Sequence, residues 1–347
     1  MSTVAPRPKK TNRLGLTMAD YKGAPSTLCA GCGHDAITSQ IVKAFYEMGV
    51  EPHRVAKMSG IGCSSKTPAY FLGSSHGFNG VHGRMPSLAT GTVLANRELV
   101  CIGVSGDGDT ASIGLGQFCH LLRRNIPMIY IVENNGVYGL TKGQFSATSD
   151  LGSRLKTGVV NDLTPIDVCS LALEMGCGFV ARGFAADPKQ LVALLESALS
   201  HRGTAVLDVL SPCVTFNDHD GSTKSYGWGK EHEELLHQID FIPHFEQLDA
   251  VDYEQGEVRE VEMHDGSRIL LRKVERNYDP TDRRAALKLL RETKMDGEFL
   301  TGLIYVNPKL RDFIDLMNLI DTPLRDLSEE QLRPGPEALQ EVVRELM

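Results

Sequence analysis

The sequence predicts an α/β protein with a doubly wound, mostly parallel sheet and an irregular C-terminal extension. Short apolar runs alternate with segments of helical periodicity between about residues 30 and 213, which is typical of a parallel sheet covered by helices. Glycine-containing turns follow several of the apolar runs. After residue 213 this alternation stops, and the sequence becomes rich in histidine, aspartate and aromatic residues. These three observations define the expected architecture.

We expect three regions along the chain. Residues 1–20 are polar and basic, and we expect a flexible arm that lacks the apolar core of a secretory signal. Residues 21–213 form the α/β domain, which also carries the loop cysteines discussed below. Residues 214–347 form an extension with a hairpin around the His264-Asp265-Gly266-Ser267 turn and a tail that wraps a partner.

Each expected element rests on a local pattern. Apolar runs of strand length cover residues 55–58, 99–104, 128–132, 179–181 and 205–210. Helical periodicity covers residues 35–48, 87–96, 113–122, 165–175, 187–200 and 283–290. Pro165 and Pro188 stand where proline is tolerated, in the first turn of a helix.

Composition and charge exclude several classes of protein. A chain of 347 residues with 41% hydrophobic residues can bury a large core. The net charge of -8, without a basic stripe, argues against nucleic-acid binding. No apolar run is long enough to span a bilayer, and we expect a cytoplasmic protein.

Two polar turns follow neighbouring predicted strands, Gly106-Asp107-Gly108-Asp109 and Asn134-Asn135-Gly136-Val137. Both then lie at the carboxyl ends of parallel strands, where open α/β sheets bind ligands. Asp107 offers a carboxylate and Asn135 an amide oxygen, which are ligands that Mg²⁺ accepts beside phosphates. The glycines leave backbone N–H groups free for phosphate oxygens. The alternative is two ordinary tight turns, since Asp-Gly and Asn-Gly are common turn formers.

Four cysteines lie in predicted loops: Cys29 and Cys32 in a C-x-x-C, Cys63 after a strand, and Cys213 after the last strand. Four loop thiolates suit an iron–sulfur cluster. A structural zinc site and a redox dithiol stay open as alternatives. Cys101, Cys119, Cys169 and Cys177 lie in or beside apolar segments and are expected to be core residues.

Six segments together resemble the β subunit of a 2-oxoacid:ferredoxin oxidoreductase, most closely the 2-oxoglutarate type (2-oxoglutarate synthase). They are TLCAGCGH, IGCSSK, HGR, GDGD…NN, YGLTKGQ and SPCVTFND, and they span about residues 20 to 240. The GDG…NN pair alone resembles the thiamine diphosphate fingerprint. The resemblance implies that the sheet belongs to the diphosphate-binding (PP module) type.

The resemblance further implies three cofactors: thiamine diphosphate, Mg²⁺ and one 4Fe–4S cluster. Asp107, Asn135 and the backbone carbonyl of Val137 would bind Mg²⁺. The cluster would be held by Cys29, Cys32, Cys63 and Cys213. The implied reaction is CoA-linked oxidative decarboxylation of 2-oxoglutarate to succinyl-CoA and CO₂, reversible with a strong reductant, with electrons passed through the cluster to ferredoxin.

The resemblance also implies cofactor contacts from Gly106, Asp107, Gly108, Asp109, His82, Arg84, Asn135, Gly139, Leu140 and Thr141. Lys66 and Leu140 match positions of the substrate pocket, where a cation suits a dicarboxylate. Each assignment has an alternative: a solvated lysine for Lys66, a structural salt bridge for His82 and Arg84, and backbone amides of its own turn for Asp109.

The implied partners are ferredoxin, a 2-oxoacid, coenzyme A and a separate α subunit. The α subunit would supply the pyrimidine-binding half of the site, because this chain is too short to hold both halves, and the assembly would be a dimer of αβ heterodimers. Other readings stay open. They are a pyruvate or broad-range oxidoreductase subunit, a non-redox thiamine diphosphate decarboxylase or synthase, and a zinc-stapled scaffold.

Overall fold

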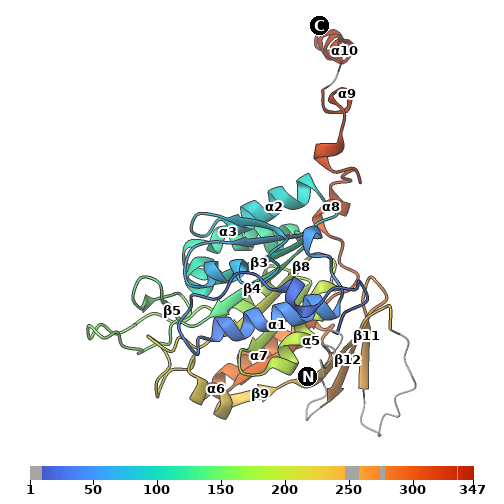
Figure 1. Ribbon diagram of the computed structural model, residues 1–347. Coiled ribbons are helices and arrows are strands. Elements are labelled where there is room, and N and C mark those ends of the chain that lie inside the picture. Colours follow the sequence, from blue (N-terminus) through green and yellow to red (C-terminus); the bar gives the residue numbers. More distant parts are fainter. Residues whose placement is uncertain (1–9, 247–257, 274–277, 334) are drawn as a thin grey trace, which may run out of the picture.

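The computed structural model of the chain describes residues 10–246, 258–273, 278–333 and 335–347. Eight strands in these ranges form one sheet (Figure 1). They are β1 Val55–Ser59, β2 His76–Asn79, β3 Val100–Gly106, β4 Met128–Asn134, β7 Phe179–Phe184, β8 Thr204–Leu210, β9 Glu233–Leu235 and β13 Phe299–Val306. Their order is β2-β1-β3-β4-β8-β7-β13-β9, and all neighbours are parallel except β13 and β7, which are antiparallel.

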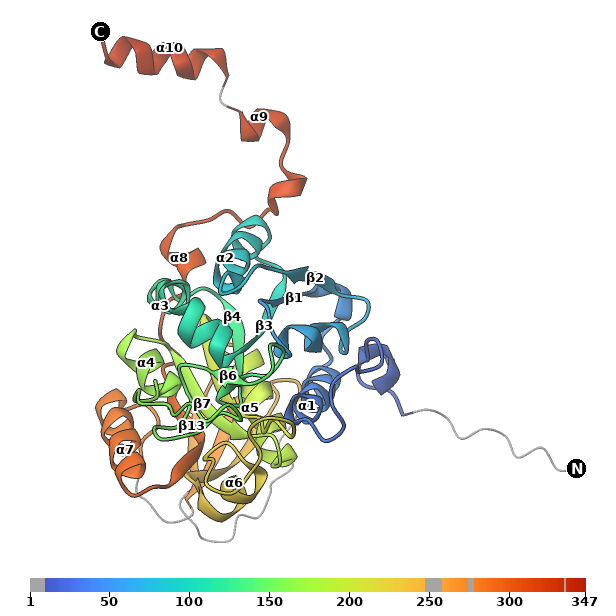
Figure 2. The same cartoon turned by 90° about the vertical axis from the view of Figure 1, so that its left-hand side faces the viewer.

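Helices cover both faces of the sheet, so that every position of β1, β4 and β8 is buried. One face packs against α1 Gly33–Glu47, α5 Pro188–Leu199 and a small antiparallel sheet of β10 His237–Ile242, β12 Arg268–Lys273 and β11 Val258–Glu262. The other face packs against α2 Met85–Ala95, α3 Leu115–Arg124, α4 Val168–Glu174 and α7 Arg283–Met295 (Figure 2). The expected doubly wound, mostly parallel architecture is confirmed.

Successive residues of β4 enter opposite cores. Ile129 and Ile131 pack on the α1 and α5 side, whereas Met128, Tyr130 and Val132 pack on the α2 and α3 side. The same alternation sends the two polar residues at the end of this strand to opposite faces of the sheet.

Several elements of the structure differ from those predicted from the sequence. A π-helical turn, η4 Gly108–Ile113, separates β3 from α3, so α3 starts at Leu115 and not at Ile113. Helix α4 starts at Val168 and not at Pro165, because the Asp167 side chain caps it by accepting a hydrogen bond from Ser170 N at 2.6 Å. Residues 76–79, for which the sequence predicts no element, form the edge strand β2.

The C-terminal part of the chain extends the main sheet, which the sequence analysis did not predict. The last strand expected for this sheet was residues 205–210, within β8. In the structure, β13 pairs with β7 and is buried at seven of its eight positions. This pairing covers the backbone edge that β7 would otherwise expose. The predicted hairpin around the His264 to Ser267 turn is confirmed as β11 and β12, although Val274 lies outside the described residues.

Residues 10–20 differ from the expected flexible arm. The Asn12 side chain donates to Tyr21 Oη at 2.8 Å and to Tyr46 O at 2.9 Å, and Arg13 Nη2 donates to Met48 O at 3.1 Å. These bonds attach the segment, including the 3-10 helix η1 Met18–Tyr21, to α1. Residues 1–9 of the expected arm lie outside the described residues.

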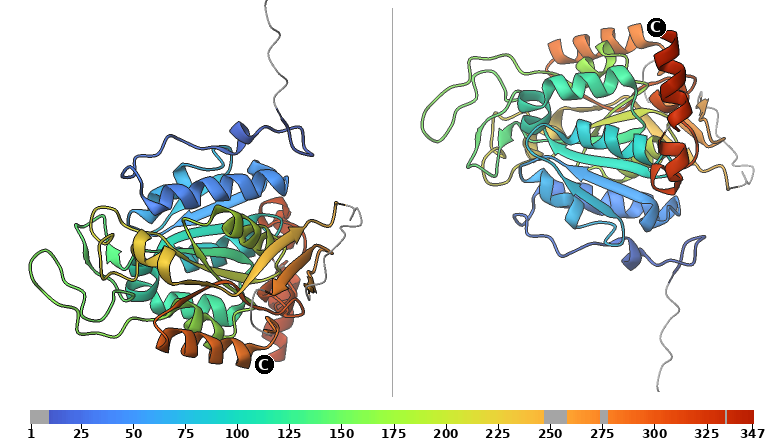
Figure 3. Two further views of the ribbon diagram at one scale, coloured as in Figure 1. Left: turned by 90° about the horizontal axis from the view of Figure 1, so that it is seen from below. Right: turned by 90° about the horizontal axis from the view of Figure 1, so that it is seen from above.

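The remaining elements are short. They are η2 Pro52–Arg54, η3 Ser64–Ala69, β5 Val137–Tyr138, β6 Gln144–Phe145, α6 Tyr226–His232, α8 Phe313–Leu316, η5 Leu324–Asp326, α9 Glu329–Leu332 and α10 Pro336–Glu345. The tail with α9 and α10 extends away from the body (Figures 1 and 2). Figure 3 shows the loop between β6 and α4 projecting beyond the sheet. None of the helices in the described ranges combines the length and apolar character that crossing a bilayer requires.

Candidate active site

The two polar turns meet at the carboxyl ends of β3 and β4. These strands are parallel neighbours with Gly106 opposite Glu133, so the residues that follow them lie side by side. Asn135 N donates to Asp107 Oδ1 at 3.3 Å, and both side chains are buried. The structure thus brings together the carboxylate and the amide that the sequence analysis assigned to Mg²⁺.

The carboxylate of Asp107 is held by donors from two loops. Thr148 Oγ1 lies 2.7 Å from Oδ2, and the Ser146 hydroxyl donates to the same oxygen. Burial raises the pKa of Asp107, and the hydrogen bonds from Ser146, Thr148 and Asn135 lower it again. Sequence reasoning missed Ser146 and Thr148; the run of hydroxyl residues in the SATS segment was the available signal.

The Asn135 turn is closed by its own side chain. Oδ1 accepts a hydrogen bond from Val137 N at 3.0 Å, as in an Asx-turn, and Asn217 Nδ2 donates to the Asn135 carbonyl at 2.8 Å. Gly136 adopts a positive φ of 72°, a conformation that favours glycine. Asn217 therefore anchors the turn from a segment 82 residues later in the chain.

The Asp109 carboxylate binds groups outside its own turn, unlike the alternative to a cofactor contact. Its Oδ1 accepts from Gly83 N at 2.8 Å and from Ile61 N at 3.3 Å. His82 Nδ1 lies against the same oxygen, and Ser105 Oγ donates to Oδ2 at 2.7 Å. Asp109 thereby joins the loops after β1, before α2 and after β3.

A pocket opens between these turns and contains most of the predicted site. It is lined by His34, Ile61, Gly62, Cys63, Ser64, His82, Gly106, Asp107, Gly108, Asp109, Asn135, Val137, Tyr138, Gly139, Leu140 and Thr141. Of the predicted cofactor-binding residues only Arg84 is missing from this lining. Its side chain is exposed, so its position lends no support to the predicted diphosphate contact.

The four loop cysteines converge beside this pocket. A Cβ built on Gly139 would lie 3.5 Å from Cys63 Sγ and 3.6 Å from Cys213 Sγ. Thr215 Oγ1 donates to Cys29 Sγ at 3.5 Å, and Cys32 N donates to Cys29 O at 3.0 Å. Burial raises the pKa of Cys32 to about 12, and nearby Glu133 and Cys213 act in the same direction. All eight cysteines, each in a described part of the chain, are free thiols.

No single-ion metal site is present among the described residues, because no group of three or more His, Cys, Asp or Glu side chains could hold a metal ion. The ligands of one zinc ion must converge on a single point, so the four cysteines do not form such a site as they stand. Ligands of a cluster bind different irons and are spaced more widely. A Cβ at position 139 would be in van der Waals contact with two of these sulfurs.

Lys66 lies three residues after Cys63, in the 3-10 helix η3, and is half-buried. Burial raises the pKa of Cys63, the Cys213 thiol adds to this, and the Lys66 ammonium lowers it. The predicted substrate-pocket residue Leu140 lines the pocket with 48% of its surface exposed. Lys66 itself is not part of the pocket lining.

A buried acid and a buried histidine beneath the pocket were not found from the sequence. Glu133 is fully buried, 3.4 Å from His34 Nδ1, and neither of its carboxyl oxygens has a hydrogen-bond partner in the structure. Burial raises the pKa of Glu133 well above its ordinary value and lowers that of His34 to about 4. His34 is therefore neutral at pH 7, and burial favours the protonated form of Glu133. An acid at the end of an apolar strand, just before Asn134, was the available signal.

The fold and this pocket define a class of protein. The family described as "Thiamine pyrophosphate enzyme, C-terminal TPP binding domain" matches residues 60–209. These residues include β3, β4, the Asp107 and Asn135 turns and nearly all of β8. The chain therefore contains a thiamine diphosphate-binding α/β domain.

Comparison with curated proteins is more specific. A 2-oxoacid:ferredoxin oxidoreductase subunit beta from Saccharolobus solfataricus is 40% identical over 235 residues, which cover 67% of this chain and 74% of that protein. The 2-oxoglutarate oxidoreductase subunit KorB of Mycobacterium tuberculosis is 41% identical over 191 residues, 55% of this chain and 51% of the relative. The chain belongs to the family of 2-oxoacid:ferredoxin oxidoreductase β subunits and is thus a subunit of an oxidoreductase.

A solved structure agrees along nearly the whole chain. A 2-oxoglutarate:ferredoxin oxidoreductase from Magnetococcus marinus, solved with 2-oxoglutarate, coenzyme A and succinyl-CoA bound, matches with a TM-score of 0.73 and 28% identity. The match covers 94% of this chain and 95% of the other. The regions outside the thiamine diphosphate domain therefore also have counterparts in that protein.

Proposed function

We propose that this chain is the cofactor-binding half of a 2-oxoglutarate:ferredoxin oxidoreductase. With an α subunit it would convert 2-oxoglutarate and coenzyme A to succinyl-CoA and CO₂ and pass the electrons to ferredoxin. The single observation that carries the proposal is the convergence of the Asp107 and Asn135 turns with four loop cysteines around one pocket.

The donor set fits a magnesium diphosphate. A buried carboxylate that three groups of the chain fix in one orientation is suited to one or two bonds with Mg²⁺. Asn135 and the carbonyl of Val137 would complete the protein ligands. Gly108 lets this turn pack closely against the Tyr138 ring, because a Cβ there would lie 2.5 Å from Tyr138 Cε1. The N-terminal turn of η4 would provide amides for the phosphates.

The bound thiamine diphosphate would supply the carbanion and electron sink for decarboxylation. The residues of this chain would orient it and exclude water. Tyr138 Oη donates to Gly108 O at 3.0 Å and closes one wall, and Asp109 holds the three surrounding loops in place. The buried side chains of His34 and Glu133 lie next to one another, and His34 also lines the pocket.

We infer that Cys29, Cys32, Cys63 and Cys213 hold a 4Fe–4S cluster. Their convergence from three loops beside the pocket supports this, as does the close approach of the Cys63 and Cys213 sulfurs to Gly139, which has no side chain. Raised thiol pKa values at Cys32 and Cys63 describe free thiols, and iron binding would replace those protons. A cluster at this position would lie next to the cofactor and accept electrons from it.

The substrate assignment rests on the names of relatives and on Lys66. Two kinds of relative are named for 2-oxoglutarate, the M. tuberculosis subunit and the 2-oxoglutarate synthase subunit of Methanocaldococcus jannaschii, which is 36% identical. A cation beside Cys63 would suit the distal carboxylate of a dicarboxylate. A broad-range 2-oxoacid oxidoreductase is the second candidate, because the S. solfataricus relative carries that wider name.

The function is tested by co-purifying this chain with its α subunit under anaerobic conditions. We expect a brown complex containing iron and sulfide, and reduction of a low-potential acceptor that depends on CoA and is fastest with 2-oxoglutarate. A colourless complex, or one that contains zinc, would contradict the cluster. Equal rates across 2-oxoacids would favour the broad-range candidate. The dimer of αβ pairs and the cytoplasmic location stay predictions.

A further inference from the structure

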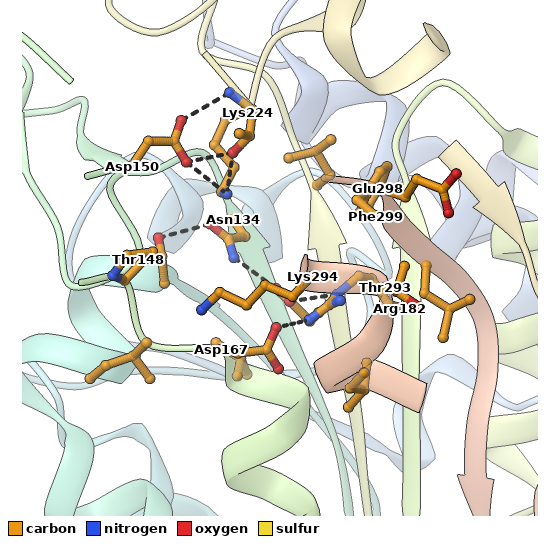
Figure 4. Close-up of a pocket in the computed structure, with 18 of the residues that line it drawn as sticks. Asn134, Thr148, Asp150, Asp167, Arg182, Lys224, Thr293, Lys294, Glu298 and Phe299 are labelled. Carbon is orange, nitrogen blue, oxygen red and sulfur yellow. Dashed lines mark hydrogen bonds and ion pairs between the residues drawn. The ribbon is translucent and has the colours of Figure 1, made fainter. Parts of the chain in front are cut away.

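A second pocket, of about 440 Å³, lies on the α4 and α7 side of the sheet (Figure 4). Its lining includes Thr148, which contacts Asp107, and four polar residues that the proposed function does not use: Asn134, Asp167, Arg182 and Asp208. These five residues belong to three strands, one loop and the N-cap of α4. Hydrogen bonds connect the five in a single line, in the order Thr148, Asn134, Asp208, Arg182 and Asp167. Figure 4 labels four of them, Thr148, Asn134, Arg182 and Asp167, and marks the bonds as dashed lines.

The strand register places the first members of this line. Arg182 on β7 is directly opposite Asp208 on β8, and its Nε donates to Asp208 Oδ2 at 3.2 Å. Asp208 is opposite Val132 on β4, so Asn134 is its diagonal neighbour on the same face. Asn134 Nδ2 donates to Asp208 Oδ1 at 2.9 Å. The two oxygens of one carboxylate therefore connect β7 with β4.

Thr148 continues the line to the cofactor site. Its Oγ1 lies 2.9 Å from Asn134 Oδ1 and 2.7 Å from Asp107 Oδ2. A hydroxyl group has one proton, so it can donate to only one of these oxygens at a time. The orientation of the Asn134 amide and the hydrogen bonding of Asp107 are consequently coupled.

Charged side chains fix the end of this hydrogen-bonded line that is farthest from Asp107. Arg182 is nearly buried between Asp167 and Asp208, with 12% of its side chain exposed. Burial would raise the pKa of Asp167, yet Arg182 and the cap of α4 bring it below its ordinary value. With Asp208 held as an acceptor, the Asn134 amide must direct its NH₂ to Asp208 and its oxygen to Thr148.

We propose that Arg182 is a positioning residue of the diphosphate site: through Asp208 and Asn134 it holds the Thr148 hydroxyl beside the carboxylate of Asp107. This rests on the proposed role of Asp107 as a magnesium ligand. The proposal also assigns a role to Asn134, the first residue of the Asn134-Asn135 pair. Asn134 ends β4 and lines the pocket that contains Arg182, whereas Asn135 follows β4 and lines the cofactor pocket.

The test measures metal binding and not turnover. The αβ complex is depleted of cofactor, and the Kd of Mg²⁺ is determined by calorimetry at saturating thiamine diphosphate. Arg182→Lys keeps the charge but loses the planar fork, and we expect it to raise the Kd about tenfold. The matched control is Arg202→Lys. Arg202 also pairs with two aspartates, Asp312 and Asp315, but at the other end of the sheet, and we expect no change in Kd.

A double-mutant cycle separates positioning from general damage. Thr148→Val removes the hydroxyl and Thr148→Ser restores it. If Arg182 acts through Thr148, Arg182→Lys weakens Mg²⁺ binding in the native background and adds nothing in the Thr148→Val background. Additive losses, or an unchanged Kd in Arg182→Lys, would overturn the proposal. If Arg182→Lys fails to assemble, Asp208→Asn provides the same cycle with a side chain of equal size.

The Asp107→Ala variant separates the proposed ligand role of Asp107 from the proposed positioning role of Arg182. If that variant binds Mg²⁺ and thiamine diphosphate like the native complex, the proposed ligand role is wrong. If it loses binding while Arg182→Lys behaves as native, only the positioning role of Arg182 is wrong.

Discussion

Asp107 and Asp109 are two residues apart and have distinct surroundings. Asp107 receives hydrogen bonds from Ser146, Thr148 and Asn135 and lines the pocket. Asp109 also borders the pocket, yet its oxygens are occupied by two backbone amides, His82 and Ser105. The acidic glycine turn therefore combines a candidate metal ligand with a residue that holds loops together. The turn sequence alone does not separate these roles.

Replacing Lys66 tests the substrate assignment at the level of one residue. We expect Lys66→Ala to lower kcat/KM for 2-oxoglutarate about tenfold more than for pyruvate, because only the dicarboxylate loses a charge-assisted contact. Steady-state assays of the αβ complex with both acids measure this. Lys43→Ala is the control, since Lys43 is a surface residue paired with Glu47. Equal losses with the two acids would remove Lys66 from substrate recognition.

At the level of elements, the β5–β6 hairpin brings the cofactor pocket and the cysteines together. Val137 at its start borders the diphosphate turn, whereas Gly139 in its loop faces Cys63 and Cys213. One short hairpin thus sets the distance between the two proposed cofactors.

Adding a methyl group in this hairpin tests the cluster site. Gly139 has no positive φ, so alanine fits the backbone, but its Cβ would fill the space beside two sulfurs. We expect Gly139→Ala to reduce iron and sulfide content at least about twofold while the fold is kept, since a cluster needs that space. Gly116→Ala, at an open position of α3, serves as the control and should retain full iron content. Full loading of Gly139→Ala would contradict the site.

The C-terminal helices are a separate element with few ties to the body. No residue of α9 or α10 is buried, and α10 exposes Leu339, Val342 and Val343. We expect deletion of residues 327–347 to leave the melting temperature of this chain within about 2 °C of native, because no buried apolar area is lost. Calorimetry measures this.

The same deletion tests the expected partner-wrapping tail. We expect weaker assembly with the α subunit, measured by sedimentation, and the same direction of effect from Leu339→Asp. Glu341→Gln is the control on the same helix. Unchanged assembly in both the deletion and Leu339→Asp would show that the tail has another role.

For the whole molecule, buried histidines predict the acid sensitivity of the fold. Burial lowers the pKa of His201 to about 3 and that of His237 to about 4, and His237 Nε2 accepts a hydrogen bond from Leu303 N. The unfolded chain binds these protons near pH 6.5. Below that pH the unfolded state takes up protons that the folded state does not, so stability falls as the pH falls toward 4.

Each such histidine contributes a slope of about 1.4 kcal/mol per pH unit in this window. We expect His201→Leu to flatten the pH dependence of the unfolding free energy between pH 6 and 4. Denaturant titrations at several pH values measure it, and His53→Leu is the control because His53 is exposed. Identical slopes for native and His201→Leu would contradict the assignment.

Local sequence patterns predict the parallel sheet, the place of most helices and strands, and most of the residues that line the pocket. These features follow from local periodicity and from the rule that parallel strands carry ligands at their carboxyl ends. The two strands from residues 233–235 and 299–306 were not predictable in this way, because a strand's partner is chosen by long-range pairing.

The packing of distant segments determines which polar groups are in contact. Ser146 and Thr148 reach Asp107 from a loop some 40 residues away, and Arg182 reaches Asn134 through Asp208 on a third strand. Glu133 is a further case. Its position in β4 directs its side chain toward His34 of α1, and its carboxyl oxygens have no hydrogen-bond partner there. Local sequence fixes which face of a strand a side chain occupies, but the packing of distant segments decides what it meets there.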